Sequence, residues 1–286
     1  MAATAKLPII DLSSPDRIST ANSIRQACVD YGFFYLVNHG VEGQLLSKVL
    51  EESKKFFSLP LNEKMKLTRK HHRGYTPFYA EKLDPLSRSK GDSKESFYVG
   101  PVEGDMAQTN LNQWPSQEIF PTWRLTMETC HKNLMSAGKK LISLIALALN
   151  LDEDYFEKVG ALDTPNGFLR LLHYPGMLVE FPLFWVCKEK FHQPRLWEDV
   201  LHIKGAFIVN IGDMMERWTN CFFRSTLHRV MPTGQERYSL AFFLDPNPDC
   251  VVECLESCCS SSCPARFPPI RSGAYLEERF KLSYGE

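Results

Sequence analysis

The sequence predicts a mainly β protein with flanking helices (α+β), built around a double-stranded β-helix, or jelly-roll, core. Two observations predict this fold class. From Asn166 onward, short segments rich in Phe, Leu, Val and Ile alternate with Pro, Gly and Asn, as in the strands and turns of a double-sheet jelly roll. Pro121 to Leu149 forms a long amphipathic pattern, and its apolar stripe predicts a helix that packs against a sheet.

Apolar runs bounded by Gly or Pro predict further elements in the first half of the chain: strands at residues 8–12 and 33–38, and helices at residues 13–31 and 43–57. Ser13 and Ser14 are expected to supply the N-cap of the first helix, and Pro15 suits its first turn. Residues 69–107 are polar, charged and turn-rich, which predicts a loop. We therefore divide a single structural domain into three parts: an N-terminal region with lid loops (1–120), a support helix with its connector (121–165) and the jelly-roll core (166–286).

The composition describes a soluble globular chain. It has 286 residues, 44% of them hydrophobic, and a net charge of −1. The 33 basic residues face 34 acidic ones, which disfavours a nucleic-acid partner. No apolar run approaches the roughly 20 residues that span a bilayer, and the N-terminus lacks the apolar core of a signal peptide. We expect a cytoplasmic monomer without a membrane or nucleic-acid partner.

The nine cysteines are unevenly placed, because five of them fall between Cys250 and Cys263. Without a secretory signal, free thiols are expected rather than disulfides. A zinc site is the alternative for this cluster, although its spacing fits the ligand rule only loosely.

Two short segments carry side chains suited to binding a carboxylate. Arg237 and Ser239 are two apart in a predicted strand, so both face the same side. The Arg fork meets a carboxylate with two hydrogen bonds, and the Ser hydroxyl adds a third donor. By the same spacing, Tyr174 shares a face with Arg170, whereas His173 faces the other way. The alternatives are a surface Arg-x-Ser and a half-buried tyrosine.

These segments, together with Arg73-Gly-Tyr-Thr-Pro77 and Asn210–Glu216, resemble the plant-type iron(II)/2-oxoglutarate-dependent dioxygenases, the isopenicillin-N-synthase-like family. The resemblance runs from Leu7 to Tyr284 and is nearest to the subgroup that contains homoarginine hydroxylases. It implies an oxidoreductase that uses Fe(II), 2-oxoglutarate and O2 to hydroxylate a small molecule, releasing succinate and CO2.

The resemblance also implies roles for individual residues. His228 corresponds to an iron ligand, and Arg237 with Ser239 to the residues that grip the distal carboxylate of 2-oxoglutarate. Tyr174 corresponds to a residue that points into the barrel and hydrogen-bonds the same cosubstrate, so His173 is expected to point outward. His39, in an Asn-His-Gly turn, and Asp213, expected as a helix cap, correspond to structural residues.

One part of the family pattern is missing. Its members complete a 2-His-1-carboxylate triad with a His-x-Asp pair, but no histidine of this chain is followed two residues later by Asp or Glu. About two strands' worth of chain is absent between Gly176 and Phe191. Glu180, in the apolar segment found there, is a candidate substitute ligand. A variant transcript, an imperfect gene model and a true pseudoenzyme each account for the gap.

The sequence therefore leaves two functions open. The first is a hydroxylase of a small molecule, such as a guanidino amino acid like homoarginine, for which Glu95 in the predicted lid is a candidate substrate contact. A solvated lid charge is the alternative for Glu95. The second is a catalytically inactive variant that acts as a binding or scaffold protein, with a partner at the apolar patch Met177–Trp185.

Overall fold

Helices and short strands alternate in the first half of the chain, and strands dominate the second half. The computed structural model describes residues 6–81, 91–104, 106–176, 184–188, 196–230 and 234–284, without the side chains of 184–188, 196 and 284. Its elements are β1 (Ile9–Asp11), α1 (Arg17–Asp30), β2 (Phe33–Val37), α2 (Gly43–Phe57), α3 (Leu61–Met65), β3 (Gly74–Thr76), β4 (Glu95–Val99), α4 (Met106–Thr109), α5 (Trp123–Ala148), α6 (Tyr155–Lys158), β5 (Asn166–Tyr174), β6 (Phe184–Lys188), β7 (Leu196–Asp199), β8 (Phe207–Asn210), α7 (Asp213–Trp218), β9 (His228–Val230), β10 (Arg237–Asp245), β11 (Val251–Val252), a 3-10 turn (Glu256–Cys258), β12 (Ile270–Arg271) and α8 (Ser272–Tyr284).

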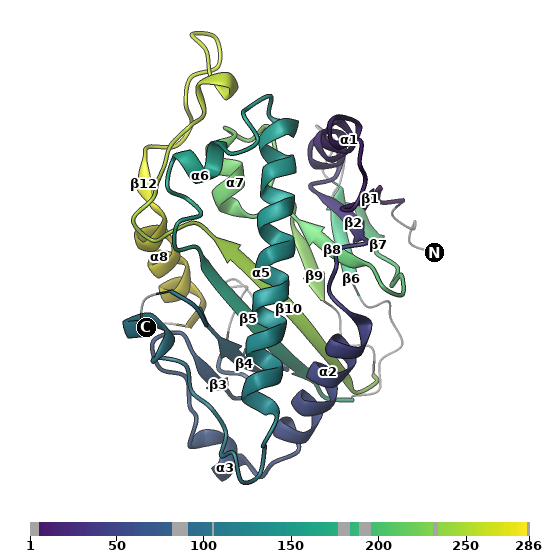
Figure 1. The fold of residues 1–286 in the computed structure, drawn as a ribbon, viewed down its shortest axis with the longest axis vertical. Coiled ribbons are helices and arrows are strands. Elements are labelled where there is room, and N and C mark those ends of the chain that lie inside the picture. Colours follow the sequence, from purple (N-terminus) through teal and green to yellow (C-terminus); the bar gives the residue numbers. More distant parts are fainter. Residues whose placement is uncertain are drawn as a thin grey trace.

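The long helix α5 is the support that its sequence pattern predicts. Its apolar residues recur every three to four positions, and they are the buried ones, from Trp123 and Met127 to Leu141 and Leu144. The helix lies across the sheet formed by β5 and β10 (Figure 1). Burial of this stripe is the main reason why a helix of this length is stable here.

The central sheet has the order β10-β5-β4-β3, with antiparallel neighbours. Strand β5 ends at Tyr174 because Pro175 cannot donate a ladder hydrogen bond. On the face toward the helices, Phe97 of β4 packs edge-on against Phe56 of α2 and Trp123 of α5, at centroid distances of 4.9 and 5.0 Å. This face is the core, and the other face of β5 and β10 carries Tyr174, Arg237 and Ser239.

Three further sheets, β1-β2-β8, β7-β6-β9 and β11-β12, make up the rest of the described β part. Within the described residues, β8 and β10 are each the last strand of their sheet. Residues 167–173 of β5 are buried, yet every residue of β10 is at least partly exposed, and Phe243 is 46% exposed. A nine-residue apolar strand with this exposure is unusual, and it fits the missing strands that the sequence predicts.

The prediction of a loop for residues 69–107 is wrong in part. Strands β3 and β4 lie in this range, and Tyr75 and Phe97 are fully buried in them. Polar composition concealed the strands because their stability comes from cross-strand pairing: β3 pairs with β4, and β4 pairs with β5, which is distant in sequence.

Two predicted helix caps are also corrected. Helix α1 begins at Arg17, and Asp16 rather than a serine is its N-cap, since the Asp16 carboxylate accepts the N–H of Ser19 at 2.9 Å. Asp213 does not cap α7, which has Gly212 in the cap position without a side-chain bond. Instead, the Asp213 carboxylate accepts the hydroxyl hydrogen of Tyr275 at 3.0 Å and ties α7 to α8.

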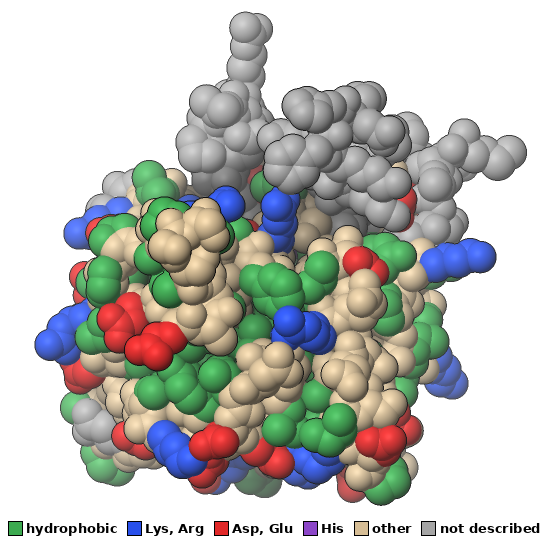
Figure 2. Space-filling view, turned by 90° about the horizontal axis from the view of Figure 1, so that it is seen from above, with side chains coloured by type: hydrophobic (Ala, Val, Ile, Leu, Met, Phe, Trp, Pro, Cys, Tyr) green, Lys and Arg blue, Asp and Glu red, His purple; other side chains and the backbone are tan. Residues whose placement is uncertain are grey.

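The surface and the cysteines agree with a globular chain. On the face shown in Figure 2, acidic and basic side chains are interspersed among apolar ones over the described residues. Among the described helices, none is long and apolar enough to cross a membrane. Each cysteine whose side chain the structure describes is a free thiol. In the same part of the chain no three metal-ligating side chains gather, so the zinc alternative has no support at Cys250–Cys263.

Candidate functional site

The three residues predicted to bind a cosubstrate lie on one strand pair. Arg237 of β10 stands directly opposite Tyr174 of β5, and its guanidinium lies 4.3 Å from the centre of the Tyr174 ring. Ser239 stands opposite Leu172, one row further on the same face. The turn before β10 contains Gly234 with φ +77°, a backbone conformation that glycine adopts without strain. Register and turn together place a planar cation, a hydroxyl and a phenol side by side.

On the described part of this face, Arg237 is the positively charged side chain that is available to an incoming anion. Arg170 lies four positions before Tyr174 on the same face of β5. It is buried and paired with Glu81, which also accepts from Lys94 at 2.9 Å. Burial alone would raise the pKa of Glu81, but Arg170 and Lys94 outweigh that effect and hold it below its usual value. For Arg237, by contrast, the described residues supply an aromatic ring and no carboxylate. A ligand carboxylate would complete its fork.

His228 lies at the start of β9, where its backbone pairs with Val186 of β6. The Nδ1–H of its exposed ring donates to the carbonyl of Thr226 at 3.1 Å, and the ring meets Phe33 edge-on at 5.4 Å. This hydrogen bond selects the tautomer with its lone pair on Nε2. Metal-binding histidines are commonly held in this way by a backbone carbonyl.

The described residues do not make a site for iron. A non-haem iron site needs several protein ligands, and no group of three or more His, Cys, Asp or Glu side chains in the described ranges is placed to hold a metal ion. The candidate substitute Glu180 lies outside these ranges. Of the predicted iron ligands, His228 is therefore the one that lies within the described residues.

Glu95 does not occupy the predicted lid. It belongs to β4 and is 1% exposed, so it is not a solvated charge. Because it pairs with His173, it shares that residue's face, which is turned away from Tyr174 and Arg237. The prediction that Glu95 contacts a substrate guanidinium at this site is wrong, since the sheet lies between them.

His173 was predicted to point outward, and it does lie on the face opposite Tyr174. That face is not solvent, however, because Phe57 of α2 stacks on the His173 ring with centroids 5.7 Å apart. His173 is 9% exposed and contacts both Glu95 and Glu236. One feature of the sequence could have indicated this group. His173 directly precedes Tyr174, and Glu236 directly precedes Arg237, so both adjoin residues predicted to bind the cosubstrate.

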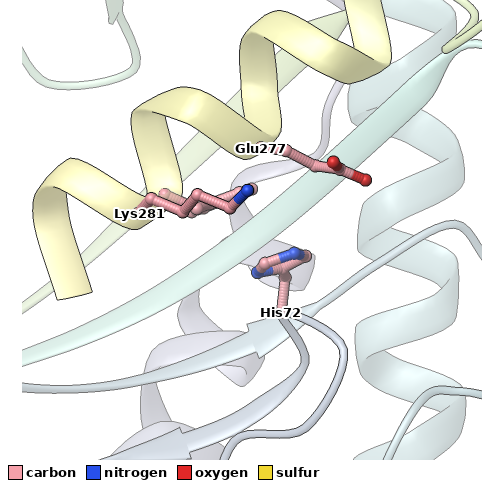
Figure 3. A pocket seen from close by; sticks show the side chains of 4 residues that line it. His72, Glu277 and Lys281 are labelled. Carbon is pink, nitrogen blue, oxygen red and sulfur yellow. The ribbon is translucent and has the colours of Figure 1, made fainter. Parts of the chain in front are cut away.

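A separate small pocket of about 180 Å3 lies between α8 and the turn before β3. Lys281 and Glu277 of α8 and His72 line it, as Figure 3 shows, and the His72 ring stacks on Phe280 at 4.1 Å. None of the residues predicted from the sequence to bind a ligand contributes to it.

The chain resembles known proteins over most of its length. A family model described as "non-haem dioxygenase in morphine synthesis N-terminal" matches residues 7–117, and one described as "2OG-Fe(II) oxygenase superfamily" matches residues 184–246. Azadirone synthase of Melia azedarach is 36% identical over 307 aligned positions, covering 96% of this chain and 92% of the relative. Since the chain has only 286 residues, that relative carries positions with no counterpart here.

Further similar proteins belong to the same family. The homoarginine-6-hydroxylase of Oryza sativa subsp. japonica is 30% identical, with 88% of this chain and 89% of the relative covered. A solved structure of a putative 2OG-Fe(II) oxygenase family protein from Caulobacter crescentus is 26% identical with a TM-score of 0.83, covering 98% of this chain and 100% of that one. JOX2, solved in complex with 2OG, Fe and JA, is 26% identical with a TM-score of 0.78, covering 97% and 86%. These likenesses confirm the predicted double-stranded β-helix fold, and the chain belongs to the 2OG-Fe(II) oxygenase superfamily.

Proposed function

We propose that this protein binds 2-oxoglutarate on the β5–β10 strand pair and belongs to the oxygenases that oxidise a small organic molecule. The observation that carries the proposal is the register of Arg237 opposite Tyr174, with Ser239 on the same face. The family membership supports the class of reaction. Arg237, Ser239 and Tyr174 are the residues assigned to the cosubstrate.

The donor set suits the distal carboxylate of 2-oxoglutarate. The two parallel N–H groups of Arg237 match the two carboxylate oxygens, and the Ser239 hydroxyl supplies one more hydrogen bond. Arg237, Ser239 and Tyr174 are all partly exposed, so a ligand can reach them. The cation–π contact with Tyr174 holds the guanidinium plane before the ligand arrives, which lowers the cost of ordering it.

We assign His228 to the metal side of the site, with Fe(II) as the metal of the family. With one ligand on the described residues, oxygenase chemistry in this chain depends on ligands outside them. An iron titration without tight binding would identify the chain as a catalytically inactive variant. The family likeness favours an active oxygenase.

The substrate class is a small molecule that reacts with O2. Homoarginine remains a candidate on the strength of a 30% identical relative. The placement of Glu95 on the helix-facing side removes the residue that had favoured a guanidino group. We also keep the expectation of a cytoplasmic monomer as part of this proposal.

Binding of the cosubstrate is tested by comparing two ligands. Calorimetric titration of the purified chain is expected to show that 2-oxoglutarate binds at least about tenfold more tightly than 2-oxobutyrate, which lacks the distal carboxylate. Hydrogen bonds to charged groups contribute roughly 1.5–3 kcal/mol, and about 1.4 kcal/mol corresponds to a factor of ten. Equal affinity for both ligands would show that the distal carboxylate is not recognised.

A further inference from the structure

A group of charged residues, with Glu95 and His173 buried, lies behind the cosubstrate residues, on the helix-facing side of the same strands. The Nδ1 atom of His173 lies 2.7 Å from a carboxylate oxygen of Glu95, and its Nε2 atom lies 3.1 Å from a carboxylate oxygen of Glu236. Glu95 belongs to β4 and His173 to β5, while Glu236 immediately precedes β10. One imidazole ring therefore joins three neighbouring strands of the sheet.

Each carboxylate of this group is held by further donors. The second oxygen of Glu95 accepts from Lys64 Nζ at 2.7 Å and from the hydroxyl of Tyr75. Burial would raise the pKa of Glu95, but hydrogen bonds from His173, Lys64 and Tyr75 outweigh it and hold the pKa below its usual value. Glu236 accepts from the hydroxyl of Tyr238 at 3.0 Å, and this bond, with a further one from His173, lowers its pKa. Both carboxylates are thus ionised at neutral pH.

The geometry requires a proton on each ring nitrogen. A neutral imidazole has one N–H donor and one lone pair, so it can donate to only one of two carboxylates. Its other nitrogen would then face a carboxylate oxygen, lone pair against lone pair. An imidazolium at His173 can donate to both carboxylates.

The other groups packed around His173 do not titrate near neutral pH. Burial, together with Glu236, raises the pKa of Tyr238 to about 12, and burial with Glu95 raises that of Tyr75 as well. Lys54 of α2 acts on Glu236 as a further positive charge. Histidine, by contrast, changes its charge between about pH 5 and 8.

The two carboxylates would respond differently to loss of the proton. Glu95 is 1% exposed and keeps Lys64 and Tyr75 as donors, whereas the Glu236 side chain is 53% exposed and can turn to water. The Glu236 contact is therefore the one that breaks. Glu236 precedes Arg237 directly, and Tyr238, which stacks on the His173 ring at 4.6 Å, follows it.

We infer that His173, as an imidazolium that bridges Glu95 and Glu236, is a positioning residue that holds the Arg237 end of β10 in register with Tyr174. When the ring loses one of its two protons, it can donate to only one of the two carboxylates, and the affinity for 2-oxoglutarate is expected to fall. This inference rests on the proposed binding of 2-oxoglutarate to Arg237.

The test measures 2-oxoglutarate affinity by calorimetry on the full chain, at intervals between about pH 6 and 9, where a histidine changes its charge. The dissociation constant of the native chain is expected to rise about tenfold over this interval, which corresponds to about 1.4 kcal/mol. Glu236→Gln should abolish the pH dependence, because an uncharged amide can pair with either form of the ring. Tyr238→Phe is the matched control, since it removes one donor to Glu236 but keeps both carboxylates, and it should retain the dependence.

Hydrogen exchange supplies a second readout that needs no ligand. After correction for intrinsic rates, protection of the amides of Arg237 to Leu240 should fall between pH 6 and 8 in the native chain and stay constant in Glu236→Gln. If protection behaves in this way but no 2-oxoglutarate binds at any pH, the proposed function fails and the bridge stands. A native chain whose affinity and protection are both independent of pH overturns the inference, as does a Glu236→Gln variant that keeps the dependence.

Discussion

Insertion of a two-strand His-x-Asp segment, taken from an intact relative, between Gly176 and Phe191 is expected to restore iron-dependent succinate formation. The inserted pair would add two ligands to His228 and complete the facial triad. The remaining residues need no change, because Tyr174, Arg237 and Ser239 already share one face of β5 and β10. The second family match begins at residue 184, within this interval.

The same insertion should make the protein more stable and more soluble. Strands β8 and β10 end their sheets within the described residues, and β10 is partly exposed along its whole length. Added strands would pair with such edges, which otherwise invite aggregation. The control is the same insertion with its histidine replaced by alanine, expected to regain solubility without succinate formation. A soluble insertion protein that binds iron yet forms no succinate with any guanidino or other amino-acid substrate would contradict the assignment.

Arg237→Ala is expected to weaken 2-oxoglutarate binding about ten- to a hundredfold. It removes both N–H donors of the fork, and hydrogen bonds to charged groups contribute about 1.5–3 kcal/mol. Calorimetry of the native and variant chains under the same conditions measures the ratio. The variant should fold normally, because the Arg237 side chain is partly exposed and stacks on one ring.

Two further substitutions calibrate this result. Arg237→Lys keeps the charge but lacks the planar fork, so an intermediate affinity is expected. Ser239→Ala removes a single hydroxyl and should have a smaller effect than Arg237→Ala. Should Arg237→Ala bind 2-oxoglutarate as well as the native chain does, Arg237 is a surface residue and the cosubstrate lies elsewhere.

Local periodicity made much of this fold predictable. The apolar stripe of residues 121–149 became α5, and the predicted helix at 43–57 became α2 with the same bounds. The two-residue period of strands also placed Tyr174, Arg237 and Ser239 on one face, because alternation is a property of the backbone. Such features depend on neighbouring residues alone.

What the sequence concealed depends on contacts between distant segments. Glu95 looks like a loop charge by composition, and its burial follows from pairing with His173, 78 positions away. His173 was expected to face outward, and nothing local indicates that Phe57 of α2 covers it. The same applies to Asp213, whose partner Tyr275 lies 62 positions further on. Alternation gives the face of a strand, and only the tertiary structure shows what covers that face.

We propose that this chain keeps the residues for binding 2-oxoglutarate but has His228 as its single iron ligand. The most direct measurement is a calorimetric titration of the native chain with Mn(II), a stand-in for Fe(II), in saturating 2-oxoglutarate. We predict no tight one-to-one binding, because one imidazole does not hold a first-row metal against water and buffer. Tight one-to-one binding would contradict the claim and would show that another residue, with Glu180 the first to test by substitution, completes the metal site.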